Sequence, residues 1–285
     1  MAKRSRKHPL RRLLVLAALI LALVLFVRWE NTSLQTAFFD PAFTELPAGF
    51  DGCRIVVLSD LHGAEFGPDN ADLFQAVADQ APDYIFYLGD LEDKYRGPEP
   101  GFAETAAAGF AAIAPTYYVT GNHEWAIGGV PELKERLEAQ GVTVLSNAFV
   151  TLERSGDTVV LAGIDDPNGY ADQKTPEELA SEIYAAYGDP FWMLLAHRND
   201  HFEKQYSLLG ADLVFSGHGH GGIIRLPFTD GLLSTDRTLF PSYTAGLYEA
   251  NGSALFVTRG LGNSGPSFRL WNRPEVAVVT LHRAD

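Results

Sequence analysis

Short hydrophobic runs of strand length alternate with helix-length amphipathic segments over most of this 285-residue chain. Strand-like runs occupy residues 54–59, 84–88, 116–120, 142–145, 158–162, 191–196, 212–216, 253–258 and 275–281. Helical patterns lie between them at residues 69–80, 102–113, 131–140 and 177–187. Apolar strands joined by helices are typical of sheets whose faces are covered by helices. The pattern predicts a single α/β domain.

Five of the strand-like runs are followed at once by residues of metal-binding type. The five motifs are Ser59-Asp60-Leu61-His62, Gly89-Asp90-Leu91-Glu92-Asp93, Gly121-Asn122-His123-Glu124, Ala196-His197 and Gly217-His218-Gly219-His220. Ligands of open α/β sheets bind beyond the carboxyl ends of the strands, so we expect these five loops to converge. Five of the eight histidines lie in them.

The spacing within the motifs suits metal chelation. In Asp60-x-His62 and His218-x-His220, one intervening residue lets two side chains point the same way. The two oxygens of Asp90 could bridge two ions, and Asn122 offers a neutral oxygen. Nitrogen and oxygen ligands without cysteine suit Mn, Fe, Zn or Co better than Ca or a structural zinc. Each motif alone also occurs in ordinary turns, whereas all five in this order favour a metal site.

A hydrophobic segment, Leu13 to Val27, follows six basic residues near the N-terminus. As a helix its 15 apolar residues cover about 22 Å, less than the roughly 30 Å hydrocarbon core of a bilayer. Leu10 and Trp29 extend it, and flanking arginines can reach the interfaces. A buried soluble helix is the alternative, but an all-apolar helix directly behind a basic run is rare in soluble domains. The segment therefore predicts membrane attachment.

The same segment allows an uncleaved anchor, a cleaved signal peptide or twin-arginine export. The residues after it, Arg28 to Asn31, lack the small residues of a cleavage site, and the Arg11-Arg12 pair supports a twin-arginine signal only weakly. We favour a single-pass anchor in the cell membrane with the body outside the cytoplasm, because basic residues stay inside. The expected division is a basic cytoplasmic stretch (1–12), an anchor (13–29), a linker and edge segment (30–52) and the main domain (53–285).

The charge of the body opposes binding to polyanions. Seven of the 22 Lys and Arg residues precede Trp29, while all 36 acidic residues follow it. The remainder therefore carries 15 basic and 36 acidic residues, a balance of −21. Such a surface repels nucleic acid, and no nucleic-acid partner is expected. A small phosphate ester stays compatible if local cations offset its charge.

Taken together, the motifs resemble the calcineurin-like metallophosphoesterase superfamily, whose pattern is D-x-H, G-D-x-x-D, G-N-H-[ED], a lone H and G-H-x-H. The likeness spans roughly residues 53–282, and the segments around residues 221–227, 259–264 and 272–275 look like its membrane-anchored bacterial branch. The resemblance implies a four-layer α/β/β/α sandwich behind the N-terminal transmembrane helix. It also implies two divalent or trivalent metal ions (Mn, Fe or Zn) and a phosphoester substrate.

The resemblance also implies a role for each motif residue. Asp60, His62, Asp90 and His220 look like ligands of the first ion, and Asp90, Asn122, His197 and His218 look like ligands of the second. A hydroxide shared by the ions would then attack phosphorus in line, hydrolysing a phosphomonoester or phosphodiester.

Each of three further residues has two possible roles. His123 either protonates the leaving group or is a structural histidine that supports the ligands. Asp93 either steadies a histidine or is a turn aspartate. Arg198 either contacts phosphate or forms an ion pair within the protein.

Several functional alternatives stay open. The membrane segment suggests a substrate at the membrane, such as a lipid-linked phosphoester or pyrophosphate. A non-catalytic metal-binding module is the second class, and the complete ligand set argues against it. A tethered adaptor with contact points at Phe38, Phe39, Tyr243 or Trp271 has little support, because scattered aromatics usually fill cores. A Ser/Thr protein phosphatase is disfavoured because Asp93 is not followed by Arg-Gly. Nothing in the sequence indicates an oligomeric state.

Overall fold

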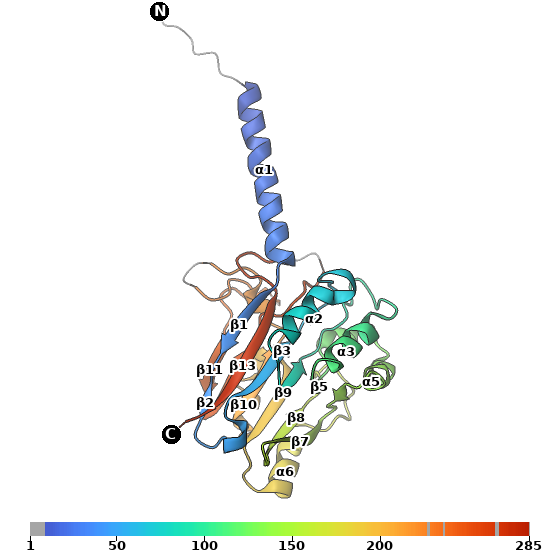
Figure 1. The fold of residues 1–285 in the computed structure, drawn as a ribbon, viewed down its shortest axis with the longest axis vertical. Helices are drawn as coiled ribbons and strands as arrows, with labels where there is room; N and C mark the ends of the chain where they lie inside the picture. The colour runs from blue at the N-terminus through green and yellow to red at the C-terminus, as the bar shows by residue number, and fades with distance from the viewer. Residues whose placement is uncertain (1–8, 227–228, 236, 266–267, 285) are drawn as a thin grey trace, which may run out of the picture.

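Two β-sheets stacked face to face form the centre of the molecule (Figure 1). In the computed structural model, residues 9–226, 229–235, 237–265 and 268–284 are described. The first sheet has the order β1 (Gln35–Phe39), β13 (Glu275–Arg283), β3 (Cys53–Leu58), β4 (Tyr84–Tyr87), β5 (Thr116–Tyr118) and β6 (Thr143–Val144), and β2 (Ala42–Phe43) also pairs with β13. The second has the order β11 (Gly246–Ala250), β12 (Ser253–Val257), β10 (Leu213–Gly217), β9 (Trp192–Arg198), β8 (Asp157–Gly163) and β7 (Ala148–Arg154).

Helices cover the outer face of each sheet. The first sheet packs against α2 (Ala71–Ala78), α3 (Phe102–Ala111) and α5 (Val130–Glu138), through a buried cluster that includes Val56, Leu73 and Phe110. The second packs against α6 (Pro176–Tyr187) through a cluster that includes Leu179 and Trp192. A third cluster fills the space between the sheets. The expected four-layer α/β/β/α sandwich is therefore confirmed.

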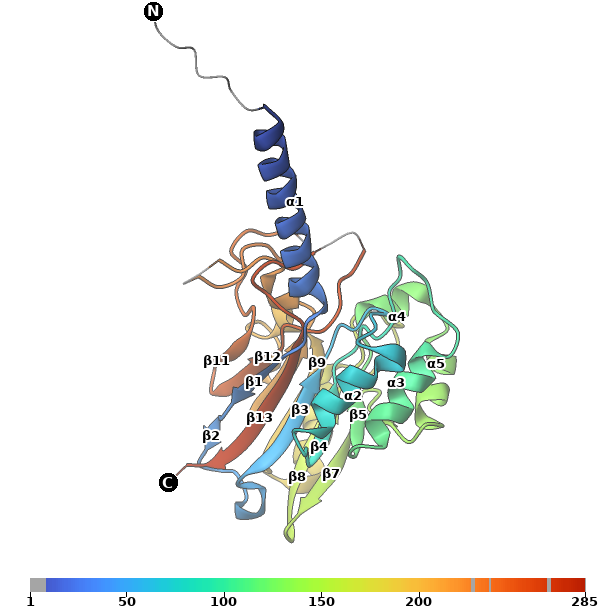
Figure 2. The ribbon, with the colours of Figure 1, turned by 45° about the horizontal axis from the view of Figure 1, so that its top comes forward.

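Parallel pairing aligns the carboxyl ends of the central strands. Strand β3 pairs in parallel with β4, and β4 with β5. In the other sheet, β9 pairs in parallel with β8 and with β10. The loops that follow these strands emerge at one end of the sandwich, which is also the end from which α1 (Pro9–Thr32) leaves (Figures 1 and 2).

The expected elements match the observed ones closely, β1 and β2 lie in the segment expected as a linker and edge segment, and β11, β7 and a short helix are additions. The antiparallel strand β11 joins β12 through Asn251-Gly252, whose positive φ angles of 52° and 82° fit a tight hairpin turn. The strand β7 pairs with β8 through Ser155-Gly156 in the same way. A short helix, α4 (Asn122–Ile127), begins where we expected a loop. Dipeptide turn signals would have located both hairpins.

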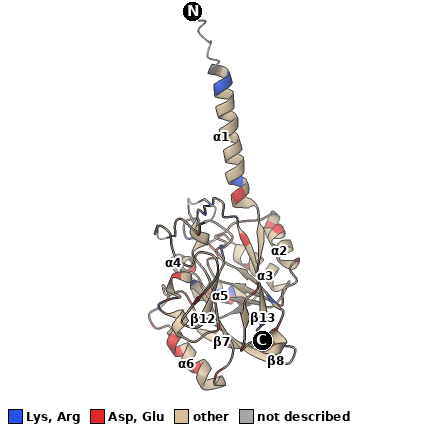
Figure 3. Cartoon of the chain, turned by 90° about the vertical axis from the view of Figure 1, so that its left-hand side faces the viewer, with Lys and Arg blue, Asp and Glu red and all other residues tan. Residues whose placement is uncertain are grey.

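Helix α1 projects from the body as a single long rod (Figures 1 and 3). An 18-residue window within residues 10–32 has a mean hydropathy of 2.6, so the helix is long and apolar enough to cross a membrane. Charged side chains lie only near its two ends (Figure 3). Residues 1–8, which hold most of the basic stretch, lie outside the described part. The division of the chain into four segments stays a prediction.

Candidate metal centre

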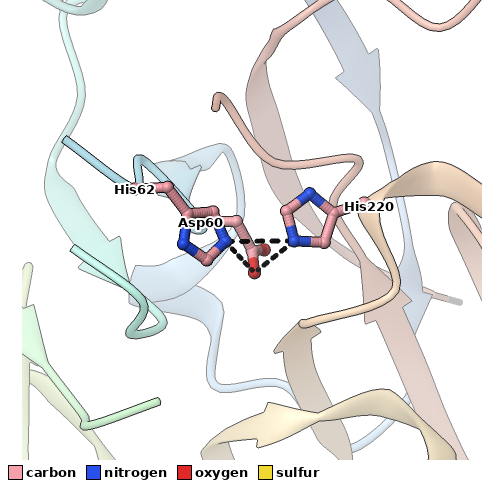
Figure 4. A group of neighbouring side chains, drawn as sticks. All are labelled: Asp60, His62 and His220. Atoms are coloured by element: carbon pink, nitrogen blue, oxygen red, sulfur yellow. Dashed lines mark hydrogen bonds and ion pairs between the residues drawn. The ribbon is translucent and has the colours of Figure 1, made fainter. Parts of the chain in front are cut away.

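The loops after β3 and β10 bring together the first group of expected ligands, Asp60, His62 and His220 (Figure 4). The Nε2 atoms of the two histidine rings lie 3.1 Å apart. Asp60 Oδ1 lies 3.8 Å from His62 Nε2 and 3.4 Å from His220 Nε2. All three side chains are buried, so three donor atoms face one another away from bulk solvent.

The loop after β4 and the ends of β9 and β10 bring together a second group, Asp90, His197 and His218. His197 Nε2 lies 3.3 Å from Asp90 Oδ2 and 3.2 Å from His218 Nδ1. The first residue of α4 adds an amide, because Asn122 Oδ1 lies 3.2 Å from the same His197 nitrogen. All seven residues expected as ligands therefore lie together in these two adjacent groups.

Asp90 connects the two groups. Its Oδ2 lies 3.7 Å from His62 Nε2 in the first group and 3.3 Å from His197 Nε2 in the second. A carboxylate in this position can be a ligand in both groups.

Backbone N–H groups hold one oxygen of each aspartate and leave the other facing the histidines. The His218 N–H donates to Asp60 Oδ2 at 3.0 Å, and the His123 N–H donates to Asp90 Oδ1 at 2.8 Å. Among the described residues, the buried Asp60 Oδ1, which faces the two histidines, has no hydrogen-bond partner. Buried polar atoms normally have one, so this orphaned oxygen indicates a missing ligand. The donor set and this oxygen fit divalent cations, which prefer such mixed nitrogen and oxygen sites.

Strained turns present these side chains. Five of the seven residues have positive φ angles between 46° and 62°, namely Asp60, His62, Asp90, His218 and His220. A non-glycine residue in this region costs on the order of 1–3 kcal/mol and is found preferentially at functional sites. Close backbone packing contributes as well, because a Cβ on Gly121 would lie 2.2 Å from Asp90 Oδ1. Only glycine fits there.

Burial keeps three of the histidine rings neutral. Burial lowers the pKa of His62 to about 3, although Asp90 opposes this shift. Burial and the Arg269 guanidinium lower the pKa of His220 to about 3, and burial and His197 hold the pKa of His218 well below its usual range. A neutral imidazole has the lone pair that a metal ligand requires.

His197 and Asp90 behave as an ion pair. Burial alone would lower the pKa of His197, but Asp90 outweighs it and raises that pKa to about 10. Burial alone would likewise raise the pKa of Asp90, which His197 brings well below its usual range. A proton on His197 thus offsets the negative charge of the site. When a cation binds, its positive charge would take the place of that proton.

The other expected residues line the rim of the site. His123 Nδ1 lies 3.1 Å from Asp93 Oδ1 and also accepts the Lys94 backbone N–H at 3.1 Å. Its Nε2 lies 3.3 Å from Ser264 Oγ. Arg198 forms a two-point ion pair with Asp166, at 2.7 Å and 3.3 Å.

Two supporting residues had no expected role. The Glu124 carboxylate accepts backbone N–H groups from Asp90 (3.0 Å), Leu91 (2.7 Å) and Gly121 (2.8 Å). Arg269 is buried, donates to the carbonyls of Gly262 and Arg259, and places Nη2 3.3 Å from His220 Nδ1. The acidic residue three positions after Gly121 is a helix-capping signal that could have identified Glu124. No local signal indicates Arg269.

A cavity of about 540 Å³ opens above the two groups. Asp90, Asn122, His218 and His220 form part of its floor, and its wall includes the cationic residues Lys94, Arg198, Arg237 and Arg269. The positive charge of this wall contrasts with the net negative charge of the body as a whole. This positive charge favours an anionic ligand in this cavity.

Comparison with known proteins agrees with this geometry. Residues 53–222 match the calcineurin-like phosphoesterase family. The chain is 29% identical over 246 residues to the uncharacterized metallophosphoesterase YkuE of Bacillus subtilis, with 83% of this chain and 81% of that protein covered. It is also 29% identical over 232 residues to the phosphodiesterase YaeI of Escherichia coli, with 80% of this chain and 82% of that protein covered.

A vertebrate relative is longer. The transmembrane protein with metallophosphoesterase domain of Danio rerio is 30% identical over 255 residues. The alignment covers 84% of this chain but 55% of that protein.

Proposed function

The chain belongs to the calcineurin-like phosphoesterase family and is a hydrolase, and from this premise we propose that it cleaves phosphoric esters at the Asp90 site. The observation that carries the proposal is the position of Asp90 Oδ2, within 3.7 Å of a ring nitrogen in each ligand group. Both phosphomonoesters and phosphodiesters are candidate substrates. No nucleic-acid partner is proposed, because the body is strongly acidic.

Two cations, drawn from Mn, Fe or Zn, would occupy this site. Asp60, His62, Asp90 and His220 would hold the first, and Asp90, Asn122, His197 and His218 the second. When bound, the cations neutralise phosphoryl charge and acidify water to supply a nucleophile at neutral pH.

The surrounding residues keep the ligands oriented. His197 Nδ1 lies 2.6 Å from the Leu88 carbonyl, so its N–H donates there and leaves Nε2 directed at the site. Glu124 holds the main chain of the Asp90 loop through its N–H groups. These contacts fix the ring and the carboxylate before any substrate enters.

His123 is positioned to act on the leaving group. Because the Lys94 N–H donates to Nδ1, the neutral ring carries its proton on Nε2, which faces Ser264 at the cavity wall. With a second proton on Nδ1, beside the Asp93 carboxylate at 3.1 Å, the imidazolium could give its Nε2 proton to the oxygen that leaves phosphorus and return to the neutral ring. Asp93, beside Nδ1, would stabilise the ring when it is charged. Arg198, fixed by Asp166, would contribute positive charge beside the phosphate.

A substrate carried by a membrane lipid is the second candidate, favoured by the position of the cavity. Asn263 lines the cavity, and its amide donates to Asn31 Oδ1 in the last turn of α1 at 2.9 Å. We propose that residues 13–29 are a single-pass anchor in the cell membrane, that residues 53–285 are the catalytic domain outside the cytoplasm, and that residues 30–52 join them. A phosphoester on a lipid would then reach the cavity without leaving the bilayer.

The test uses the full chain in detergent or nanodiscs with added Mn²⁺. Hydrolysis of bis-p-nitrophenyl phosphate and p-nitrophenyl phosphate is compared between the native protein and Asp90→Asn, and elemental analysis gives the metal content. We expect Asp90→Asn to lose about 100-fold or more of the activity together with bound metal. Asp189→Asn, an exposed position, is the matched control and should retain both. Equal, negligible rates for the native protein and Asp90→Asn would favour the non-catalytic binding module.

A further inference from the structure

Helix α1 continues into the body without a flexible tether. It ends at Thr32, and β1 begins three residues later at Gln35. Its last turn is tied to a distant loop, because the Asn272 N–H donates to Glu30 Oε2 at 3.1 Å and the Arg269 N–H donates to Asn31 Oδ1 at 2.7 Å. Glu30 is buried in the body. The distance between the body and a bilayer around α1 is therefore fixed.

The apolar part of α1 is shorter than a bilayer core and ends close to the body. Leu13 to Val27 span about 22 Å as a helix, against roughly 30 Å of hydrocarbon. Phe26 and Val27, the last two apolar residues, are already half-buried, unlike residues 10–25. Since the body contacts α1 from Glu30 onward, three residues after the apolar segment ends, the loops beside α1 lie close to the membrane interface.

Those loops form a small irregular layer of neighbouring chain segments. Ile224 bridges to Leu270, the Leu232 N–H donates to the Ile224 carbonyl at 2.7 Å, and the Phe240 N–H donates to the Leu232 carbonyl at 3.0 Å. The segments around residues 270, 224, 232 and 240 thus lie side by side. Figures 1 and 2 place these loops at the end of the body from which α1 leaves.

The layer, whose segment from Arg269 to Asn272 contacts α1, exposes large apolar side chains. Phe240 is 68% exposed and Trp271 is 50% exposed, and Leu226, Leu239 and Phe268 are exposed with them. Single exposed apolar residues are ordinary, but a group of them on adjacent segments marks an interaction surface. Aromatic residues are enriched at membrane interfaces. The stretch from Asn251 to Pro274, which carries Phe268 and Trp271, contains no acidic residue in a strongly acidic protein, which suits an anionic lipid surface on that side. The segment from Leu226 to Phe240 contains Asp230, which pairs with Arg225.

We propose that Leu226, Leu239, Phe240, Phe268 and Trp271 form a membrane-docking surface that inserts into the interface of the bilayer holding α1. The docking surface adds apolar side chains at the membrane interface, where the apolar part of the short helix has ended. It also fixes the orientation of the body, because α1 and the layer then contact the bilayer at two places. Ile223 and Leu233, from the same loops, line the cavity, so the docking surface and the cavity share this layer.

The test measures depth in the full chain in lipid nanodiscs. Cysteines introduced by Phe240→Cys and Trp271→Cys carry an environment-sensitive fluorophore, and quenchers attached to lipid acyl chains report membrane contact. Native Cys53 is fully buried and does not compete for the label. Leu19→Cys in α1 is the positive control. Tyr187→Cys, at the end of α6 and 48% exposed, is the matched negative control at the far end of the body.

Interfacial insertion places a side chain roughly 5–10 Å into the boundary of headgroups and acyl chains, so we expect positions 240 and 271 to lose more than about half of their emission. Position 187 should be unaffected. Quenching at positions 240 and 271 no greater than at position 187, with position 19 quenched, would overturn the docking surface while leaving the anchor intact. A lack of quenching at position 19 would overturn the anchor and the docking surface together. Neither outcome bears on hydrolysis of soluble esters, which tests the proposed function separately.

Discussion

Glu124 holds Asp90 by its main chain, because Glu124 Oε2 accepts the Asp90 N–H at 3.0 Å. The same carboxylate gathers the N–H groups of Leu91 and Gly121, so one side chain fixes two strand-end loops that both contribute ligands. Burial and the negative charge of Asp90 raise the pKa of Glu124 to about 7. The arrangement keeps the ligand carboxylate free for a cation.

Replacing Glu124 should weaken metal binding without removing a ligand. Glu124→Ala leaves at least three buried N–H groups without their acceptor, and each costs about 1–3 kcal/mol. We expect a lower melting temperature and a loss of metal affinity of about 10- to 100-fold, measured by thermal unfolding and by metal titration. Glu132→Ala, on the exposed face of α5, is the control. Unchanged metal affinity in Glu124→Ala would show that the loops hold their shape without it.

Replacing Arg269 should affect one ligand group more than the other. Arg269 lies beside His220 and donates to the carbonyls of Gly262 and Arg259, and Lys cannot reproduce this planar set of donors. We expect Arg269→Lys to bind one metal ion per chain under conditions in which the native protein binds two, as measured by elemental analysis. Arg283→Lys, at the end of β13, should bind two. Equal loss at both sites would contradict a local effect on His220.

The stability of the protein should carry a pH-dependent contribution from Asp212, far from the metal centre. Burial raises the pKa of Asp212 to about 6, above that of an unfolded aspartate. Ionisation therefore disfavours the folded state, and this penalty is absent below about pH 4 and complete above about pH 6. Asp212→Asn keeps an oxygen to accept the Trp192 N–H.

We expect Asp212→Asn to raise the melting temperature relative to the native protein more at about pH 7.5 than at about pH 4.5. Asp172→Asn, exposed on the surface and absent from the charges that act on Asp212, should show the same small difference at both values. If Asp212→Asn changed the melting temperature equally at both pH values, packing and not the charge of Asp212 would account for the change.

The single cysteine should be unreactive in the folded protein. Cys53 is fully buried at the start of β3, and burial raises the pKa of its thiol to about 12. Because the thiolate is the reactive form, a thiol reagent should modify no cysteine in the native state and one per chain in denaturant. Rapid modification of the native protein would show that β3 opens locally.

Much of the fold followed from local pattern. The alternation of apolar strands and amphipathic helices predicted an α/β domain, because strand and helix periodicities are properties of neighbouring residues. The four-layer sandwich was implied by the family resemblance. The hairpins at Ser155-Gly156 and Asn251-Gly252 were missed although their turn residues are a local signal. The beginning of α4 at Asn122 was missed because the motif was treated as a loop.

The sequence by itself determined which donor atoms the site contains and at which strand ends they stand, since both depend on residue type and local order. Only the tertiary structure placed Asp90 between two groups of histidines, enlisted Glu124 and Arg269, and joined α1 to the loop beside the cavity. The bond from Arg269 to Asn31 connects residues 238 positions apart. Contacts of that kind depend on how strands from the two ends of the chain pack together, which no local pattern records.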